Sequence, residues 1–301
     1  MKIKFIYNTM KQDYLLKTDD GTSTLFLEEY EQAMHSISGA YEEALLKHVI
    51  PSRVLECNNT ELNVLDIGFG LGYNVLALMN EFIKRQNVIV PARLRRAGTG
   101  RSLRLNIISL KKEKDFFEFM KDVRFNDHRD DLYNFIKDSY YSGCGTYNKI
   151  NLKILFGDAR VTALKLKDKK FNAIFHDPFS PSKNPELWSV DFFRVLKDLM
   201  CEDAILTTYS SADHIRRAMM EAKFYVGIGP SVGKKREGTI AAVKQNITEI
   251  DNERKNKITA NIKSVPYRDP NLDFPREKIL ENRLIEITTA KQFKQDRLIR
   301  Q

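Results

Sequence analysis

The sequence predicts an α/β fold whose sheet is mostly parallel and ends in an antiparallel hairpin. From residue 63 onward, short apolar segments alternate with amphipathic segments of helical spacing. This is the pattern of a parallel sheet covered by helices on both faces. A glycine-rich turn joins the first apolar segment to the first amphipathic one. The last two apolar segments, 224–228 and 239–243, lie too close together for a helical crossover, so they should pair as a hairpin.

The predicted elements follow one another in a simple order. Residues 11–30 indicate a hairpin, and residues 40–50 have the spacing of a helix. Further strands are expected at 64–67, 105–110, 152–156, 171–175 and 204–208, and helices at 74–84, 114–140, 187–199 and 211–222. We therefore expect an N-terminal hairpin and helix extension (1–62), a central domain (63–244), and a charged C-terminal extension (245–301) that packs on or near the core and ends in a helix.

Composition restricts the setting in which this chain works. No run approaches the roughly 20 apolar residues of a membrane helix and no signal peptide is visible, so we expect a cytoplasmic protein without a membrane partner. Cys57, Cys144 and Cys201 are isolated, so neither disulfides nor a metal site is expected. The net charge of +9 suits a polyanionic partner, although a lysine-rich composition would give the same surplus.

A glycine loop with the sequence LDIGFGLGYN occupies residues 65–74. Its spacing is GxGxG after an acid, Asp66, rather than the GxGxxG of dinucleotide sites. Gly68, Gly70 and Gly72 let the backbone turn sharply between strand and helix, and let a ligand pack against the main chain. Asp66 could hold an ammonium group, directly or through water. The pattern is typical of class I S-adenosylmethionine (SAM) methyltransferases.

A second acidic residue, Asp158, follows the third predicted strand in the segment FGDAR at 156–160. A carboxylate at this edge can accept a hydrogen bond from the exocyclic amine of an adenine. The alternative is an N-cap of the helix that follows. The position of Asp158 relative to the glycine loop favours the adenine of SAM.

The segment HDPFSPSKNPELW at 176–188 follows the next strand. Asp177 could hold an amine with its lone pair facing a methyl donor and receive the displaced proton, although an Asp before Pro is otherwise typical of a turn. Phe179 could stack on a planar base, and Lys183 could pair with a phosphate or stabilise the loop. His176 should point to the opposite side of the strand from Asp177, so we expect it to be structural.

Two basic segments could contact nucleic acid. Residues 231–238 carry three consecutive cations in the loop of the last hairpin, where a solvated charged turn is the alternative. Residues 90–104 form a second basic loop, which contains glycine and lies between the first helix and the second strand.

These motifs together resemble the methyltransferase part of the MnmC family, enzymes that complete 5-methylaminomethyluridine at the tRNA wobble position. The resemblance spans roughly residues 14–290 and is closest to stand-alone members that lack the FAD oxidase part. Its most diagnostic pattern is DxFxPxKNPxxW at 177–188. The other matching segments include LDIGFGLGYN at 65–74, FGDAR at 156–160, TTYSSADHIRR at 207–217, GKKREG at 233–238 and VPYRDP at 265–270.

The resemblance implies a Rossmann-like class I methyltransferase domain that transfers a methyl group from SAM to the amine of 5-aminomethyluridine in the tRNA anticodon stem-loop. Asp177 would be the catalytic carboxylate, with Phe179 and Lys183 shaping the uridine pocket. The residues implied for the cofactor are Asp66, Gly68, Phe69, Gly70, Gly72, Asn74, Asp158 and Ala159. Neither FAD nor a metal is expected, since the residues after Lys244 are too few for a flavin domain. The sequence makes no prediction of the oligomeric state.

One position departs from the family pattern. In its members the second strand ends in an acid that holds the ribose hydroxyls of SAM, within a segment like ISFEK. This chain has Lys111 there, in the segment ISLKK at 108–112. A lysine cannot accept hydrogen bonds from the diol. Either Glu113 takes over this contact, or cofactor affinity is reduced.

Two other functions fit parts of the pattern. An aminopropyltransferase of the spermidine-synthase kind would use the same fold and a comparable aspartate, but Lys183 and the nearby cations would repel a polyamine. A catalytically weak RNA-binding protein with a methyltransferase fold would account for Lys111. We expect the methyltransferase.

Overall fold

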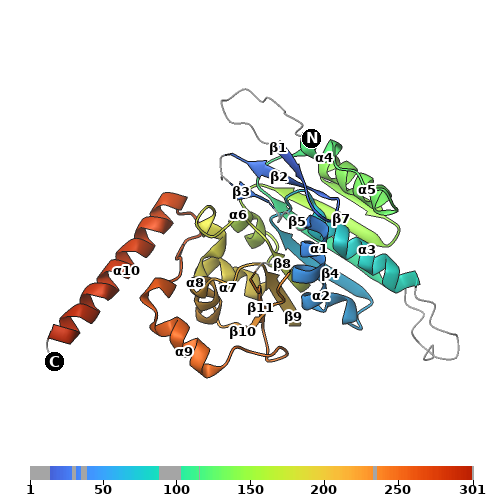
Figure 1. The fold of residues 1–301 in the computed structure, drawn as a ribbon. Helices are drawn as coiled ribbons and strands as arrows, with labels where there is room; N and C mark the ends of the chain where they lie inside the picture. Colours follow the sequence, from blue (N-terminus) through green and yellow to red (C-terminus); the bar gives the residue numbers. More distant parts are fainter. Residues whose placement is uncertain are drawn as a thin grey trace.

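The computed structural model describes residues 14–28, 32–34, 39–87, 103–114, 116–232 and 236–299. At its centre lies an eight-stranded sheet with the order β10-β11-β9-β8-β4-β5-β7-β6 (Figure 1). The five strands from β9 to β7 run parallel. At one edge β11 pairs antiparallel with β9 and β10 pairs antiparallel with β11, and at the other edge β6 pairs antiparallel with β7. The predicted parallel sheet with a terminal antiparallel hairpin is confirmed.

The strands of this sheet have bounds close to the predicted ones. They are β4 (Glu61–Ile67), β5 (Arg104–Lys111), β6 (Cys144–Tyr147), β7 (Ile150–Phe156), β8 (Phe171–His176), β9 (Met200–Thr208), β10 (Tyr225–Ile228) and β11 (Thr239–Ala242). Only β6 was not expected. It pairs with β7 through a tight turn in which Asn148 takes a left-handed conformation (φ 52°). Asparagine tolerates that conformation better than most residues, so a short hairpin forms there.

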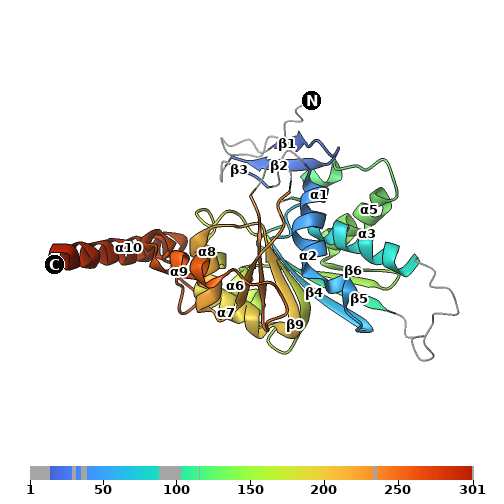
Figure 2. The same ribbon diagram turned by 60° about the horizontal axis from the view of Figure 1, so that its bottom comes forward.

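Helices cover both faces of the sheet (Figures 1 and 2). The first face, called the α3 face here, carries α1 (Ala40–Ala44), the π-turn η1 (Leu45–Val49), α2 (Ile50–Ser52), α3 (Tyr73–Asn87), α4 (Phe117–Lys121) and α5 (Arg129–Ser142). The other face, the α7 face, carries α6 (Ala159–Leu164), α7 (Val190–Asp198) and α8 (Asp213–Glu221). Alternate side chains of each strand enter one of two cores, because strand side chains alternate in direction.

A three-stranded sheet precedes this body and lies over one end of it (Figure 2). Its strands are β1 (Tyr14–Lys17), β2 (Ser23–Leu27) and β3 (Gln32–Ala33), so the predicted N-terminal hairpin is confirmed. The hydroxyl of Tyr73 on α3 donates to the carbonyl oxygen of Ser23 at 2.6 Å and accepts from its N–H at 3.1 Å. This small sheet is thereby fixed to the first helix after the glycine loop.

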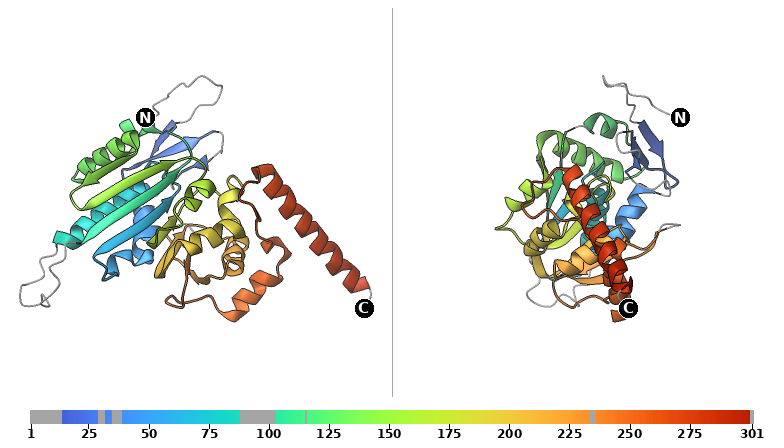
Figure 3. Two further views of the ribbon diagram at one scale, coloured as in Figure 1. Left: turned by 180° about the vertical axis from the view of Figure 1, so that it is seen from behind. Right: turned by 90° about the vertical axis from the view of Figure 1, so that its left-hand side faces the viewer.

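The C-terminal extension holds more structure than the expected tail with a final helix. It contains α9 (Asn252–Ala260), a 3-10 turn η5 (Ile262–Ser264) and α10 (Arg276–Ile299). The segment between η5 and α10 lies against α7, with the carbonyl of Tyr267 accepting from the N–H of Val190 at 3.0 Å. From there α10 projects away from the body (Figures 1 and 3). None of the helices in the described part of the chain is both long and apolar enough to span a membrane.

Candidate active site

A cavity of about 450 Å³ opens at the carboxyl ends of the central strands. In open α/β sheets, ligands bind at this edge, near the point where the strand order reverses. Its walls come from the glycine loop, the segment after β5, the start of α6, the loop after β8, and the first residues of α10. Its lining includes Gly68, Gly70, Glu113, Asp158, Ala159, Asp177, Phe179, Lys183 and Arg276.

The glycine loop brings two parts of the chain into backbone contact. Gly68 has φ +90°, and a Cβ there would lie 2.3 Å from the carbonyl oxygen of Asp177. The N–H of Asp177 in turn donates to the carbonyl of Ile67 at 2.8 Å. Any larger residue at position 68 would therefore push the loop that carries Asp177 away from the sheet.

Two residues that the family resemblance assigns to the cofactor serve packing in this structure. Phe69 is buried and stacks on Tyr140 of α5, with the ring centroids 5.4 Å apart. A Cβ on Gly72 would lie 2.9 Å from the Phe69 ring, so Gly72 makes room for that ring. Phe69 and Gly72 thus hold the loop on α5, whereas Gly68 and Gly70 face the cavity.

A row of polar side chains lies beneath the cavity on the α3 face. Ser109 of β5 is in register with Asp66 of β4, and its hydroxyl donates to Asp66 Oδ2 at 2.9 Å. Asn74 of α3 donates from Nδ2 to Asp66 Oδ1 at 3.3 Å and to Asp177 Oδ2 at 3.0 Å. Asp66 is only 1% exposed, and burial raises its pKa to about 6. Asp66 therefore lies behind the residues that line the cavity and does not itself face the space that a ligand would fill.

Asn74, which contacts the cavity-lining Asp177, also carries an acceptor without a partner among the described residues. Its Oδ1 atom is buried and has no hydrogen-bond partner among the residues that the structure describes. Buried polar atoms are almost always satisfied, so an orphaned acceptor beside a cavity indicates a missing donor. Asn74 lies one contact behind the cavity lining, and its oxygen is a candidate acceptor for a ligand N–H group.

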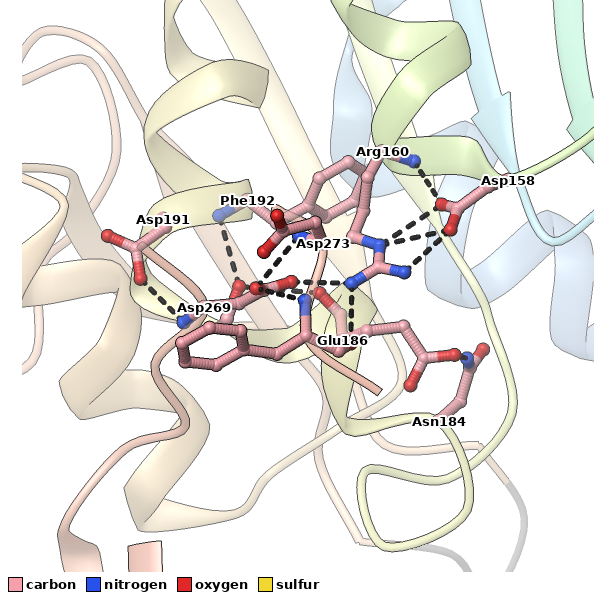
Figure 4. Close-up of polar contacts among 10 residues, drawn as sticks. Asp158, Arg160, Asn184, Glu186, Asp191, Phe192, Asp269 and Asp273 are labelled. Carbon is pink, nitrogen blue, oxygen red and sulfur yellow. Dashed lines mark hydrogen bonds and ion pairs between the residues drawn. The ribbon is translucent and has the colours of Figure 1, made fainter. Parts of the chain in front are cut away.

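Asp158 caps α6 and forms an ion pair at the same time. Its Oδ1 accepts from the N–H of Arg160 at 2.9 Å, and its Oδ2 lies 2.6 Å from Arg160 Nη2 (Figure 4). Burial alone would raise its pKa, but the hydrogen bonds from Arg160 hold the pKa of Asp158 below its usual value. The N-cap alternative is therefore what the structure shows, and the carboxylate also remains part of the cavity lining.

Arg160 links this wall of the cavity to the C-terminal extension. Its Nη1 atom lies 2.6 Å from Oδ2 of Asp269, a carboxylate that is fully buried (Figure 4). The other oxygen of Asp269 accepts from the N–H groups of Asp273 at 3.1 Å and Phe274 at 3.0 Å. Sequence reasoning missed this role. The only signal was the Asp-Pro pair of the VPYRDP segment, which indicates a turn.

The loop from Asp177 to Trp188 is held in place by its own Trp188 and by side chains of two other segments. The indole N–H of Trp188 donates to the carbonyl of Phe179 at 2.8 Å, and the hydroxyl of Tyr209 donates to the carbonyl of Pro178 at 3.0 Å. At its tip, Arg276 of α10 donates to the carbonyl of Ser182 at 3.2 Å. These contacts keep Phe179 and Lys183 at the mouth of the cavity.

Lys111, which stands where the family pattern has an acid, packs on an aromatic ring. Lys111 is buried, and its Nζ lies 3.4 Å above the centre of the Phe116 ring, a cation–π contact. Glu113 is exposed and is one of the residues that line the cavity. An acid is therefore available two residues after the position where the family pattern places it.

The basic segments fall largely outside the described residues. Residues 88–102 and 233–235 are not described, so the loop at 90–104 and two of the three consecutive cations stay sequence-based predictions. Arg236 is described, and its carbonyl accepts a hydrogen bond from Nζ of Lys47 at 2.9 Å.

His176 is a core residue, as predicted from strand alternation. It is fully buried on the α7 face, where its ring lies 4.7 Å from Trp188 and 5.2 Å from Phe193. Burial, reinforced by the nearby His48, lowers the pKa of His176 to about 3. The imidazole is therefore neutral in the folded protein over the physiological pH range.

The folded protein should lose stability on acidification because of His176. Between about pH 6.5 and pH 3 the unfolded chain binds a proton there that the folded protein does not, so the free energy of unfolding falls by about 1.4 kcal/mol per pH unit. In denaturant titrations, wild type should lose about 2 kcal/mol more than His176→Phe between pH 7 and pH 5. Identical pH dependence of the two proteins would show that His176 titrates normally in the fold.

Comparisons with known proteins agree with the fold and the cavity described above. Residues 133–244 match the family model described as S-adenosyl-L-methionine-dependent methyltransferase. An uncharacterized protein, MJ0670, from Methanocaldococcus jannaschii is 31% identical over 94% of this chain and 75% of its own length. The crystal structure of MnmC2 from Aquifex aeolicus superposes with a TM-score of 0.78 and 31% identity, covering 91% of this chain and 85% of that one. The chain belongs to the MnmC-like family of SAM-dependent methyltransferases.

Membership of the MnmC-like family assigns the fold to the class I SAM methyltransferases. Bifunctional MnmC proteins named for tRNA 5-methylaminomethyl-2-thiouridine biosynthesis are also similar, with 26% identity to the one from Burkholderia vietnamiensis. That match covers 68% of this chain but only 31% of the Burkholderia protein, so this MnmC-like chain spans about a third of that relative. Within the described ranges, no cluster of three or more His, Cys, Asp or Glu side chains could hold a metal ion.

Proposed function

We propose that this protein transfers a methyl group from SAM to the primary amine of 5-aminomethyluridine at the wobble position of tRNA. The observation that carries the proposal is the placement of Asp177. Its side chain is 17% exposed, lies at the cavity, and comes from the loop that touches the glycine loop through the backbone of Gly68. A carboxylate fixed beside a cofactor cleft is what an amine acceptor needs for orientation.

The cavity residues fit SAM. Gly68 and Gly70 would allow close approach of the cofactor to the main chain, and the orphaned Oδ1 of Asn74 would accept from its ammonium group. Asp66 would then orient Asn74 from below rather than touch the ammonium itself. Asp158, with Ala159 beside it, would receive the adenine amine. When bound, SAM supplies an electrophilic methyl group on a sulfonium.

The carboxylate of Asp177 would act on the amine. At a pH below the pKa of the aminomethyl group, its nitrogen is protonated. This ammonium has no lone pair with which to attack the methyl group. Asp177 would bind this ammonium, accept one of its protons as the nitrogen approaches the methyl group, and hold the lone pair in line. After transfer the nitrogen again carries a positive charge, and Asp177, now protonated, would return its proton to solvent to recover the carboxylate.

Three residues that line the cavity suit the remainder of the nucleotide. Phe179 is half-buried and could stack on the uracil ring, while Lys183 and Arg276 add positive charge near the entrance. We propose the tRNA anticodon stem-loop as the macromolecular partner.

Methyl transfer from radiolabelled SAM tests this function. The substrates are two preparations of the same tRNA, one with 5-aminomethyluridine at the wobble position and one with unmodified uridine there. We expect label only in the first preparation. Equal labelling of both would overturn the substrate assignment, and no labelling of either would overturn the proposed reaction.

Glu113 should contribute to SAM binding by taking the place of the missing acid. Replacing Glu113 by glutamine removes a charged acceptor for the ribose hydroxyls, so SAM should bind about tenfold more weakly in calorimetry. Glu118→Gln is the matched control, since Glu118 is an exposed acid in the same region that pairs with Lys121 at 2.7 Å. If both variants bind SAM like wild type, the ribose contact lies elsewhere.

A further inference from the structure

A buried histidine from the N-terminal region reaches the proposed catalytic carboxylate. His48 lies in the π-turn η1 and is 1% exposed. Its Nε2 atom is 3.7 Å from Oδ1 of Asp177, and its Nδ1 atom is 3.0 Å from the hydroxyl oxygen of Thr207. His48 and Asp177 are far apart in the sequence, and no sequence motif includes both.

The topology explains why these groups meet. Thr207 of β9 is in register with Phe175 of β8, which is itself in register with Asp66 of β4. Asp177 follows Phe175 by two residues and therefore points to the same face of the sheet. His48 lies above that face, with its ring 5.8 Å from the ring of Phe175. The histidine thus extends the polar row under the cavity by one more strand.

Asn74 and His48 each approach one of the two carboxylate oxygens of Asp177. Asn74 donates to Oδ2 at 3.0 Å, and His48 Nε2 approaches Oδ1. If the Thr207 hydroxyl donates to Nδ1, the neutral imidazole carries its proton on Nε2, directed at the carboxylate. A separation of 3.7 Å is longer than a hydrogen bond, and contacts of this kind often tighten only when substrate is bound.

We propose that His48 is a positioning residue for Asp177. Its Nε2–H holds the carboxylate turned so that the free lone pairs face the cavity, with Thr207 fixing the tautomer. The proposal rests on the proposed function, because it assumes that Asp177 meets the amine. Its physical core, the pairing of His48 with Asp177, can be measured without any substrate.

A pair of variants separates positioning from mere packing. The amide nitrogen of glutamine lies about as far from Cα as histidine Nε2, whereas that of asparagine corresponds to Nδ1. His48→Asn should therefore lower kcat about 10- to 100-fold, with the SAM dissociation constant and the KM for tRNA within about twofold of wild type. His48→Gln should recover most of kcat. The control is His214→Asn, at a half-buried histidine of α8 whose ring meets Tyr267 edge-on, and it should leave kcat unchanged.

A purely structural role for His48 would give a different pattern. Equal losses in His48→Asn and His48→Gln, or wild-type kcat in His48→Asn, would overturn the proposal. A loss confined to the KM for tRNA or to SAM affinity would also overturn it, because positioning of Asp177 acts on the chemical step.

A double-mutant cycle distinguishes this failure from failure of the proposed function. The urea midpoint of unfolding is measured for His48→Asn, Asp177→Asn and the double variant. We expect the double variant to lose less than the sum of the single losses, because each single change removes the same contact. Additive losses would overturn the pairing. Coupled losses in a protein that does not methylate tRNA would keep the pairing and overturn only the proposed function.

Discussion

Replacing Asp177 by asparagine is expected to abolish methyl transfer while leaving SAM binding nearly unchanged. Asparagine has almost the same shape and can still accept from Asn74, so the loop and the cavity should persist. It carries no charge to bind an ammonium and cannot take up its proton. Loss of a positioned acid–base group costs about 10²- to 10⁴-fold in rate, so kcat should fall by at least about 10²-fold.

The measurement combines single-turnover methyl transfer with calorimetry of SAM binding. Asp213→Asn is a suitable control, because Asp213 is a carboxylate at the start of α8 that pairs with Arg254 at 2.8 Å. It should behave like wild type in both assays. An Asp177→Asn protein with more than a tenth of wild-type kcat would contradict the assigned role of Asp177.

Replacing Asp269 by asparagine is expected to have the largest effect on stability. Asp269 is fully buried, and the side chain of its partner Arg160 is only 11% exposed. Asparagine removes one of the two carboxylates that pair with Arg160 and leaves Asp158 as the other, so the free energy of unfolding should fall by about 2–3 kcal/mol, the loss of a charged hydrogen bond. SAM affinity should fall too, because Arg160 also orients Asp158 at the cavity wall.

Chemical denaturation and SAM calorimetry check this expectation. Asp273→Asn provides the control, since Asp273 lies in the same turn but its side chain is exposed. Its unfolding free energy should stay within about 0.5 kcal/mol of wild type. If Asp269→Asn were as stable as Asp273→Asn, the link between the C-terminal extension and the cavity would be dispensable.

The sequence was sufficient for features that repeat locally. Strand and helix periodicity located the sheet, and the glycine spacing located its ligand-binding edge. Strand alternation separated His176 in the core from Asp177 at the cavity. In each case the physical cause, the direction of side chains along a strand or the need for a sharp turn, acts within a few residues.

The missing parts depend on contacts between distant segments. Asp269 meets Arg160 across 109 residues of chain, and His48 meets Thr207 across 159. Periodicity carries no information about such pairs. The glycine loop shows the same limit on a smaller scale, because its spacing did not reveal that Phe69 and Gly72 pack on α5 while Gly68 and Gly70 face the cavity.

Mass spectrometry of the nucleosides of the treated tRNA tests the central claim most directly. tRNA carrying 5-aminomethyluridine is incubated with the protein and SAM, digested and analysed. We expect 5-aminomethyluridine to be converted to the species with one added methyl group on its amine, and only when SAM is present. Persistence of 5-aminomethyluridine, or a methyl group on any other nucleoside instead, would contradict it.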